Sequence, residues 1–163
     1  KRYLAAGEPA KALQLIEECF VYPHHLGEGK LHGAQENDFN YYKACALQAL
    51  GQETDARACF EAASVGNSQP AAAVYYNDQK PDKIFYQGLA LRKLGRENEA
   101  CGRFNRLIDF GEKHLFDVFK MDYFAVSLPD LQIWEDDMDK KNRILILQRR
   151  WTTTIKACKY IEI

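Results

Sequence analysis

The 163-residue chain lacks three features that would point to a function at once: a long apolar run, an excess of charge of one sign and a pair of closely spaced cysteines. No segment approaches the roughly 20 uninterrupted apolar residues of a membrane span. The 22 Lys and Arg residues balance 23 Asp and Glu residues, and no basic run stands out. We therefore expect neither a nucleic acid nor a membrane surface as the main partner.

The five cysteines contain no Cys-x-x-Cys pair. An odd number of unpaired cysteines fits free thiols in a reducing compartment, which favours a cytoplasmic location. The chain starts with Lys1 rather than Met and lacks the apolar segment of a signal peptide near its start, so we expect it to be cut from a longer protein. With 47% hydrophobic and 28% charged residues, its composition is that of one globular domain.

The sequence does contain an internal repeat with an offset of 44 residues. An apolar residue follows the last Ala of each copy after four positions, at Ile16, Phe60 and Phe104. Three copies in the same alignment are hard to obtain by chance. The recurring segments are Gly7-Glu8-Pro9-Ala10-Lys11-Ala12, Gly51-Gln52-Glu53-Thr54-Asp55-Ala56 and Gly95-Arg96-Glu97-Asn98-Glu99-Ala100.

Each copy predicts a helical hairpin. The Gly ends one helix at low cost in a left-handed conformation, and the small Ala lets the next helix approach closely. Apolar residues four and seven positions after that Ala continue one stripe of a helix. We predict an all-α fold with units at 1–37, 38–81 and 82–126, and capping helices at 109–126 and 131–148. The expected core residues are Leu13, Ile16, Phe60, Phe104, Leu107, Leu115, Phe119 and Phe124.

The repeat resembles the tetratricopeptide repeat, which has Gly or Ala at its eighth position, Gly near its fifteenth, Ala at its twentieth and an aromatic residue at its twenty-fourth. The usual period of that family is about 34 residues, so the units here are longer, with the additional residues in the segments 21–37 and 66–81. The resemblance implies a right-handed superhelical solenoid with long loops on one face. The matching residues are Ala44, Gly51, Ala56 and Phe60, and then Gly88, Gly95, Ala100 and Phe104.

A second resemblance covers residues 1–142 and is to the repeat region at the C-terminal end of large bacterial proteins. In those proteins an upstream domain of unknown function resembles carbohydrate-active β-sandwich enzymes, which implies a missing N-terminal neighbour for this chain. Residues 143–163 depart from the pattern, and we predict a degenerate capping helix or an altered tail there. The matching stretches are 22–31, 75–78, 85–90 and 122–130.

In tetratricopeptide folds the first helix of each unit lines a concave groove. Aromatic side chains with polar tips are frequent in interface hot spots and also stack on sugar rings. We expect about half of the four aromatic residues in this groove to pack between neighbouring helices instead. Carried over position by position, the resemblance implies a groove lined by Asp38, Tyr41, Tyr42, Cys45 and Gln48, and by Asp82, Phe85, Tyr86, Leu89 and Arg92.

Three other segments contain residue types that are common in metal or phosphate sites, but not at the spacing that such sites need. The histidines His24, His25 and His32 match no zinc spacing. Residues 135–139 lack the order of a calcium loop, and residues 27–30 lack the rest of a phosphate-binding loop. We therefore predict no metal, no cofactor and no catalytic residue.

The predicted function is a non-enzymatic scaffold that binds a protein segment, or its own missing N-terminal domain, in the aromatic groove. The alternative is an accessory part of a carbohydrate-processing bacterial protein, in which the inter-repeat loops, above all 21–37, complete a neighbouring active site. A structural spacer without a groove ligand is a third reading. Only six residues precede Gly7 in the first unit, and homodimerisation through its exposed apolar surface is a further hypothesis.

Overall fold

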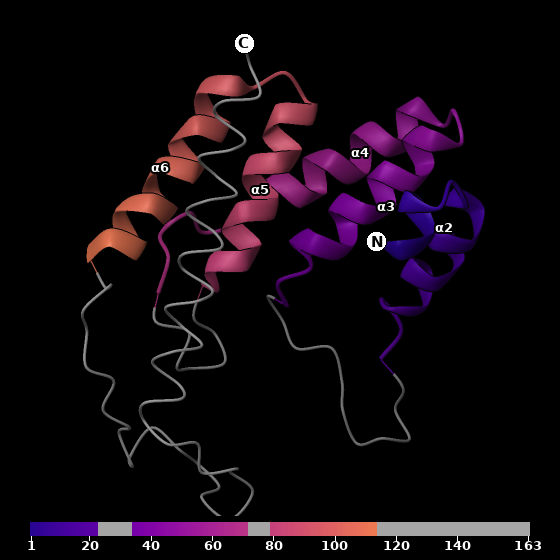
Figure 1. Ribbon diagram of the computed structural model, residues 1–163, viewed down its shortest axis with the longest axis horizontal. Helices are drawn as coiled ribbons and strands as arrows, with labels where there is room; N and C mark the ends of the chain where they lie inside the picture. The colour runs from indigo at the N-terminus through magenta and orange to yellow at the C-terminus, as the bar shows by residue number, and fades with distance from the viewer. Residues whose placement is uncertain (23–33, 72–78, 114–163) are drawn as a thin grey trace, which may run out of the picture.

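The computed structural model describes residues 1–22, 34–71 and 79–113 (Figure 1). All regular elements in the described part of the chain are helices, and it contains no strand, as predicted for an all-α fold. Its helices are α1 (Arg2–Ala5), α2 (Pro9–Glu18), α3 (Asn37–Ala49), α4 (Glu53–Ser64), α5 (Pro81–Lys93) and α6 (Glu97–Lys113).

The helices recur with the 44-residue offset of the sequence. The second helices of the three hairpins begin at Pro9, Glu53 and Glu97, and the first helices α3 and α5 begin at Asn37 and Pro81. Proline suits the first turn of a helix because it has no N–H to leave unpaired and its φ is already helical. The offset in the sequence is thus also an offset in the backbone.

The turn inside each hairpin has the same geometry. Gly7, Gly51 and Gly95 have φ of 75°, 77° and 75°, in the left-handed region that disfavours residues with a side chain. The Gly51 N–H donates to the carbonyl oxygen of Gln48, and the following N–H donates to that of Leu47, both at 3.0 Å. The same pair of hydrogen bonds closes the other two turns. The predicted role of the repeated glycine is confirmed.

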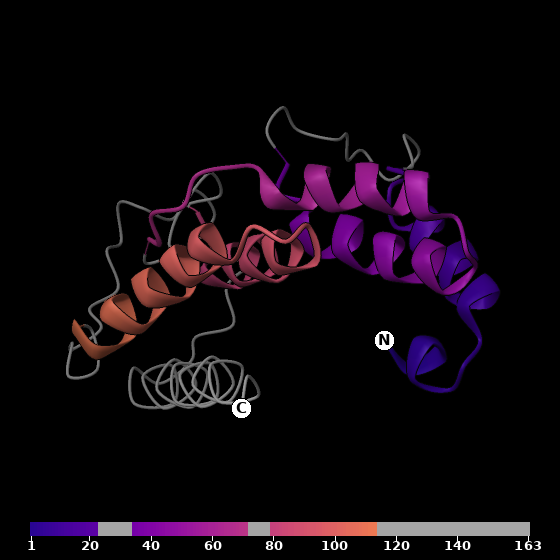
Figure 2. The same ribbon diagram turned by 90° about the horizontal axis from the view of Figure 1, so that it is seen from above.

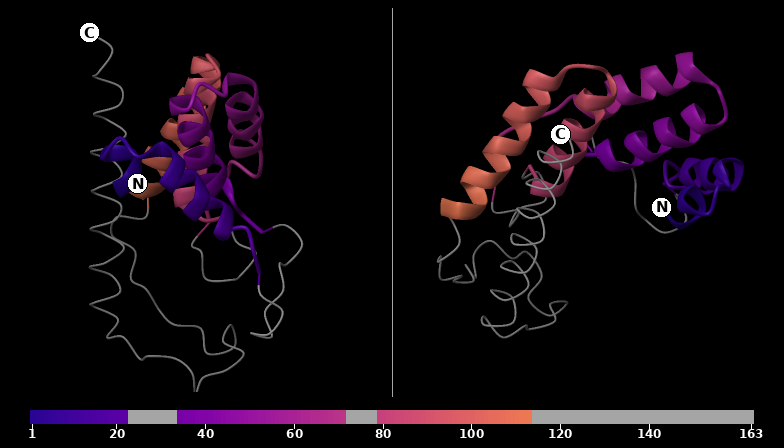
Figure 3. Two further views of the ribbon diagram at one scale, coloured as in Figure 1. Left: turned by 90° about the vertical axis from the view of Figure 1, so that its right-hand side faces the viewer. Right: turned by 45° about the horizontal axis from the view of Figure 1, so that its top comes forward.

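Consecutive helices pack against one another along the whole described chain, and α3 also contacts α5. Seen from above, the helices follow a curved path in which α1 and α6 bend toward the same side (Figure 2). The hairpins succeed one another in chain order in the right-hand view of Figure 3. None of the described helices is long and apolar enough to cross a membrane.

Two clusters of buried side chains hold the hairpins together. The first joins α3, α4 and α5 around Phe60, which is 3% exposed. The second joins α5 and α6 around Phe104, which is 2% exposed. The first cluster comprises Ala44, Leu47, Ala56, Phe60, Ala63 and Ala90, and the second Ile84, Leu91, Ala100, Phe104 and Leu107.

The predicted burial is confirmed for Phe60, Phe104 and Leu107. Leu13 and Ile16 are predicted core residues as well, but they are only half-buried. The cause is the short helix α1, which covers little of α2. The other predicted core residues lie outside the described residues, namely Leu115, Phe119 and Phe124.

The start predicted for the first capping helix is also wrong. The sequence predicts a separate helix from Asp109, whereas α6 runs without interruption to Lys113. Its buried stripe continues from Leu107 to Gly111, so the packing that holds the helix extends past the predicted boundary. Residues 114–126, the second capping helix at 131–148 and the tail at 143–163 lie outside the described residues.

Candidate functional site

The candidate site is the face shared by α3 and α5. The ten residues predicted for the groove all lie on these two helices, five on each, at spacings that place them on one side of a helix. Each of the ten is half-buried, so each has a surface that a partner could reach while its remainder packs against the protein. They are Asp38, Tyr41, Tyr42, Cys45, Gln48, Asp82, Phe85, Tyr86, Leu89 and Arg92.

Two of the four aromatic residues pack on the core. Tyr41 packs against the first buried cluster, and its ring centroid lies 5.8 Å from that of Phe60. Phe85 packs against the second cluster, with its centroid 5.9 Å from that of Phe104. These are equivalent positions of consecutive units, so the repeat places one inward-facing ring on each first helix.

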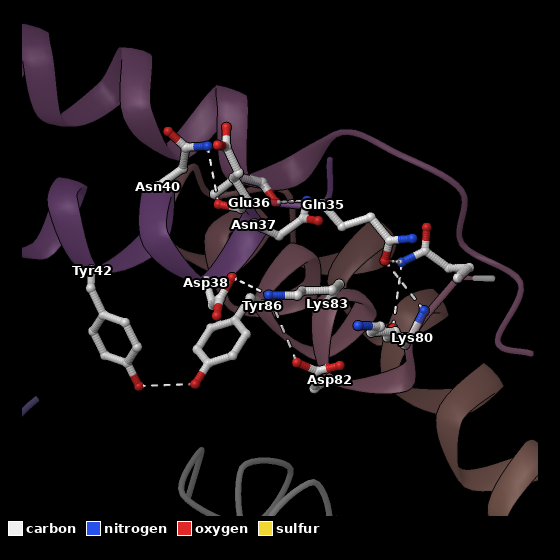
Figure 4. Close-up of polar contacts among 12 residues, drawn as sticks. Gln35, Glu36, Asn37, Asp38, Asn40, Tyr42, Lys80, Asp82, Lys83 and Tyr86 are labelled. Carbon is white, nitrogen blue, oxygen red and sulfur yellow. Dashed lines mark hydrogen bonds and ion pairs between the residues drawn. The ribbon is translucent and has the colours of Figure 1, made fainter. Parts of the chain in front are cut away.

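The other two aromatic residues, Tyr42 and Tyr86, meet each other. Their hydroxyl oxygens lie 3.0 Å apart in a hydrogen bond, and their ring centroids lie 5.5 Å apart (Figure 4). The Tyr41 ring lies 5.6 Å from Tyr42 and 5.7 Å from Tyr86, behind the pair. Burial raises the pKa of Tyr42 to about 12, so at neutral pH its phenol is protonated. We call Tyr42 and Tyr86 the tyrosine pair.

The side chain of Lys1 covers the tyrosine pair. Its ammonium nitrogen Nζ lies 5.2 Å from the ring centroid of Tyr42 and 5.8 Å from that of Tyr86, within the range of a cation–π contact. Hydrogen bonds to the two phenols raise the pKa of Lys1, so the ammonium form is favoured there. A cation therefore occupies the centre of the candidate site.

A row of polar contacts joins α3 to α5 beside the tyrosine pair (Figure 4). Lys83 Nζ lies 2.5 Å from Asp38 Oδ1 and 3.9 Å from Asp82 Oδ2. Further along, Lys93 Nζ donates to Gln48 Oε1 at 3.3 Å. The Lys83–Asp38 and Lys93–Gln48 contacts connect residues 45 positions apart and fix how the two helices lie against each other.

The groove predicted from sequence omitted the lysines that contact it. Lys83, Lys93 and Lys1 each bind a predicted groove residue. Lys83 and Lys93 each follow a groove residue directly in the sequence. Each also lies 45 positions after a groove residue that accepts its hydrogen bond, Asp38 for Lys83 and Gln48 for Lys93. That spacing, close to one repeat, is the signal that could have indicated them. No signal in the repeat pattern could have indicated Lys1, because a flexible side chain carries it to the site.

The thiol of Cys45 lies on the same face. Burial raises the pKa of this thiol, and a hydrogen bond with Tyr41 opposes that shift. The thiol is therefore protonated at neutral pH, which suits packing better than nucleophilic attack. Within residues 1–22, 34–71 and 79–113 no group of three or more His, Cys, Asp or Glu side chains could hold a metal ion. The histidines His24, His25 and His32 lie outside the described residues, as do residues 27–30 and 135–139.

No protein-family model matches the chain, and no solved structure matches it either. The candidate site therefore has to be interpreted from its own residues.

Proposed function

We propose that the chain is a non-enzymatic interaction module, and that the face of α3 and α5 binds a protein segment or a neighbouring domain. The observation that carries this proposal is the tyrosine pair. Two half-buried tyrosines from consecutive hairpins lie side by side on one face, and the flexible side chain of Lys1 lies over their rings. Tyrosine in this setting offers large contact area at a low cost in side-chain entropy, as interface hot spots require.

The proposal includes the architecture of the module. We infer a right-handed solenoid of the tetratricopeptide type, and the support is the constant offset of 44 residues between helix starts together with three identical glycine turns. Sequential packing of each helix on the next is what stacked hairpins require. First helices of such units form a continuous surface, which is where the tyrosine pair lies.

The chemistry of the site favours binding over catalysis. Burial raises the pKa of Tyr41, Tyr42 and Cys45, so each of these groups carries its proton at neutral pH. Protonated phenols and a protonated thiol donate hydrogen bonds and pack, and they are poor nucleophiles and poor bases.

Two other hypotheses stay predictions. The carbohydrate-processing alternative depends on the loop 21–37, most of which lies outside the described residues. Homodimerisation depends on apolar surface at the first hairpin, where Leu15 is 41% exposed.

Site-specific photo-crosslinking tests the proposed function. A photoreactive amino acid placed at Gln48, half-buried on the proposed face, is compared with the same amino acid at Arg57, which is exposed on α4. Both variants are incubated with lysate of the source cells, and the adducts are identified by mass spectrometry. The proposal expects a defined adduct from the Gln48 position that is absent from the Arg57 position. Equal adducts from both positions, or none from Gln48, would contradict a binding role for this face.

A further inference from the structure

The contact of Lys1 with the tyrosine pair shows what kind of group this site accepts. An ammonium group lies over two ring faces and is hydrogen-bonded to their phenols. The electron-rich faces of aromatic rings attract a cation, and a phenol oxygen accepts a hydrogen bond from it. A carboxylate or phosphate could accept a hydrogen bond from a phenol O–H, but the electron-rich ring faces would repel it.

We propose that the tyrosine pair is a recognition site for a lysine side chain of a basic partner segment, and that Lys1 occupies this site as an internal competitor when the partner is absent. The proposal rests on the proposed function, because it names the chemistry of the segment that binds the face of α3 and α5. An incoming lysine would make the same contacts that Lys1 makes, so exchange of one ammonium for the other leaves no charge unpaired at the rings.

One of the two carboxylates beside the tyrosine pair can receive a basic group from a partner segment. Asp38 and Asp82 lie one helical turn before Tyr42 and Tyr86 on the same faces of α3 and α5. Lys83 lies between the two carboxylates and is 12% exposed, and Asp82 is 42% exposed. The Asp82 carboxylate can therefore accept a second basic group from a segment whose lysine lies over the tyrosines.

The site also has the properties that such exchange needs. Lys1 precedes α1, a helix of only four residues, and the described α1 contains no buried residue. Its side chain can therefore leave the tyrosine pair without opening a hydrophobic cluster. Tyr42 and Tyr86 keep their positions independently of Lys1, because each also contacts the Tyr41 ring that packs on the core.

The test uses the 163-residue chain with labelled tyrosine rings and follows their NMR signals during titration with a short peptide, acetyl-Gly-Lys-Gly-amide. The matched peptide acetyl-Gly-norleucine-Gly-amide has the same apolar stem and no charge. The variant Lys1→Ala removes the internal competitor. The control variant Lys11→Ala removes a cation–π contact to a ring outside the tyrosine pair, in which Lys11 Nζ lies 4.4 Å from the Tyr3 ring centroid.

We expect the lysine peptide to shift the signals of Tyr42 and Tyr86, and the norleucine peptide to leave them unchanged. If Lys1 fills the site nine times in ten, Lys1→Ala binds the lysine peptide about tenfold more tightly than the unaltered chain. Lys11→Ala should bind it as the unaltered chain does.

Two results would overturn the inference: equal affinity for the lysine and norleucine peptides, or no gain in affinity in Lys1→Ala. Such a failure is separable from failure of the proposed function. An adduct from the Gln48 position alone, together with no preference for lysine, means that the face binds a segment of different chemistry. If the Gln48 position gives no specific adduct and the lysine peptide does not bind, the face of α3 and α5 is not a binding site.

Discussion

The two complete hairpins, α3/α4 and α5/α6, share one backbone plan and fill it differently. Ala44 lies beside Phe60 in the first hairpin, and Gly88 holds the equivalent position beside Phe104 in the second. A Cβ atom added to Gly88 would lie 2.7 Å from Cζ of Phe104, closer than carbon atoms approach without strain. Because Gly88 has no side chain, the Phe104 ring of the second hairpin can lie directly on the backbone of α5.

The volume lost at Gly88 is replaced elsewhere in the second hairpin. Ile84 and Leu107 are buried there, where the first hairpin has Asn40 and Ala63. The two hairpins share their helix positions and turn geometry, while the distribution of side-chain volume differs from one to the other. Changes at equivalent positions should therefore have different effects in the two hairpins.

The largest expected effect comes from Gly88→Ala. The clash with Phe104 costs about 3 kcal/mol and the gain in helix propensity returns about 1 kcal/mol, so the free energy of unfolding should fall by about 2 kcal/mol. Gly102→Ala is the matched control, because Gly102 is also helical and has no atom within 4 Å of an added Cβ. That variant should gain about 1 kcal/mol. Urea titration measures both, and stabilisation by Gly88→Ala would show that the ring can move away at little cost.

A smaller effect is expected at the junction of α3 and α4. Asn37 Nδ2 donates to the carbonyl oxygens of Ala63 and Val65 at 2.9 and 2.8 Å, and so satisfies the end of α4. Asn37→Ala should lower the free energy of unfolding by about 1–2 kcal/mol, because buried carbonyl groups lose their donor. The equivalent residue in the next unit is Pro81, which has no such amide. Pro81→Ala in the same titration is the comparison, and an equal loss in both variants would contradict the role of the amide.

The smallest expected effect is a difference in pH dependence. Burial raises the pKa of Tyr41 and raises that of Tyr42 to about 12, which favours the neutral phenols of the folded chain. Their stabilisation is complete below the unfolded-state pKa of about 10 and is lost as pH rises through the folded-state value. Tyr41→Phe, which copies Phe85 of the next unit, should reduce the loss of stability between pH 10 and pH 12.

The reverse change checks that result. Phe85→Tyr adds a phenol at the equivalent place in the second hairpin and should steepen the alkaline loss of stability, measured by urea titration at each pH. Parallel pH profiles for all three proteins would show that these buried phenols do not govern alkaline unfolding.

Sequence was sufficient to predict the hairpins because glycine turns and apolar stripes are local properties that recur at one offset. Phe60 and Phe104 belong to those apolar stripes, so their burial could be predicted from the sequence. The exact partition of Tyr41 and Tyr42 between core and surface could not be predicted, because adjacent helical positions point in different directions and both are tyrosine. The contact of Lys1 with the tyrosine pair could not be predicted from the sequence either, because it depends on where the short helix α1 lies relative to α3 and α5.

The chain of rings from Phe60 through Tyr41 and Tyr86 to Phe85 and Phe104 has a consequence for how the molecule unfolds. Neighbouring rings along it lie 5.7 to 5.9 Å apart, and it runs from one buried cluster into the other. Opening either hairpin alone would therefore strip packed surface from the other. Hydrogen exchange in α3 and α5 should report one shared opening event, with α1 and the first turn of α2 exchanging separately and earlier.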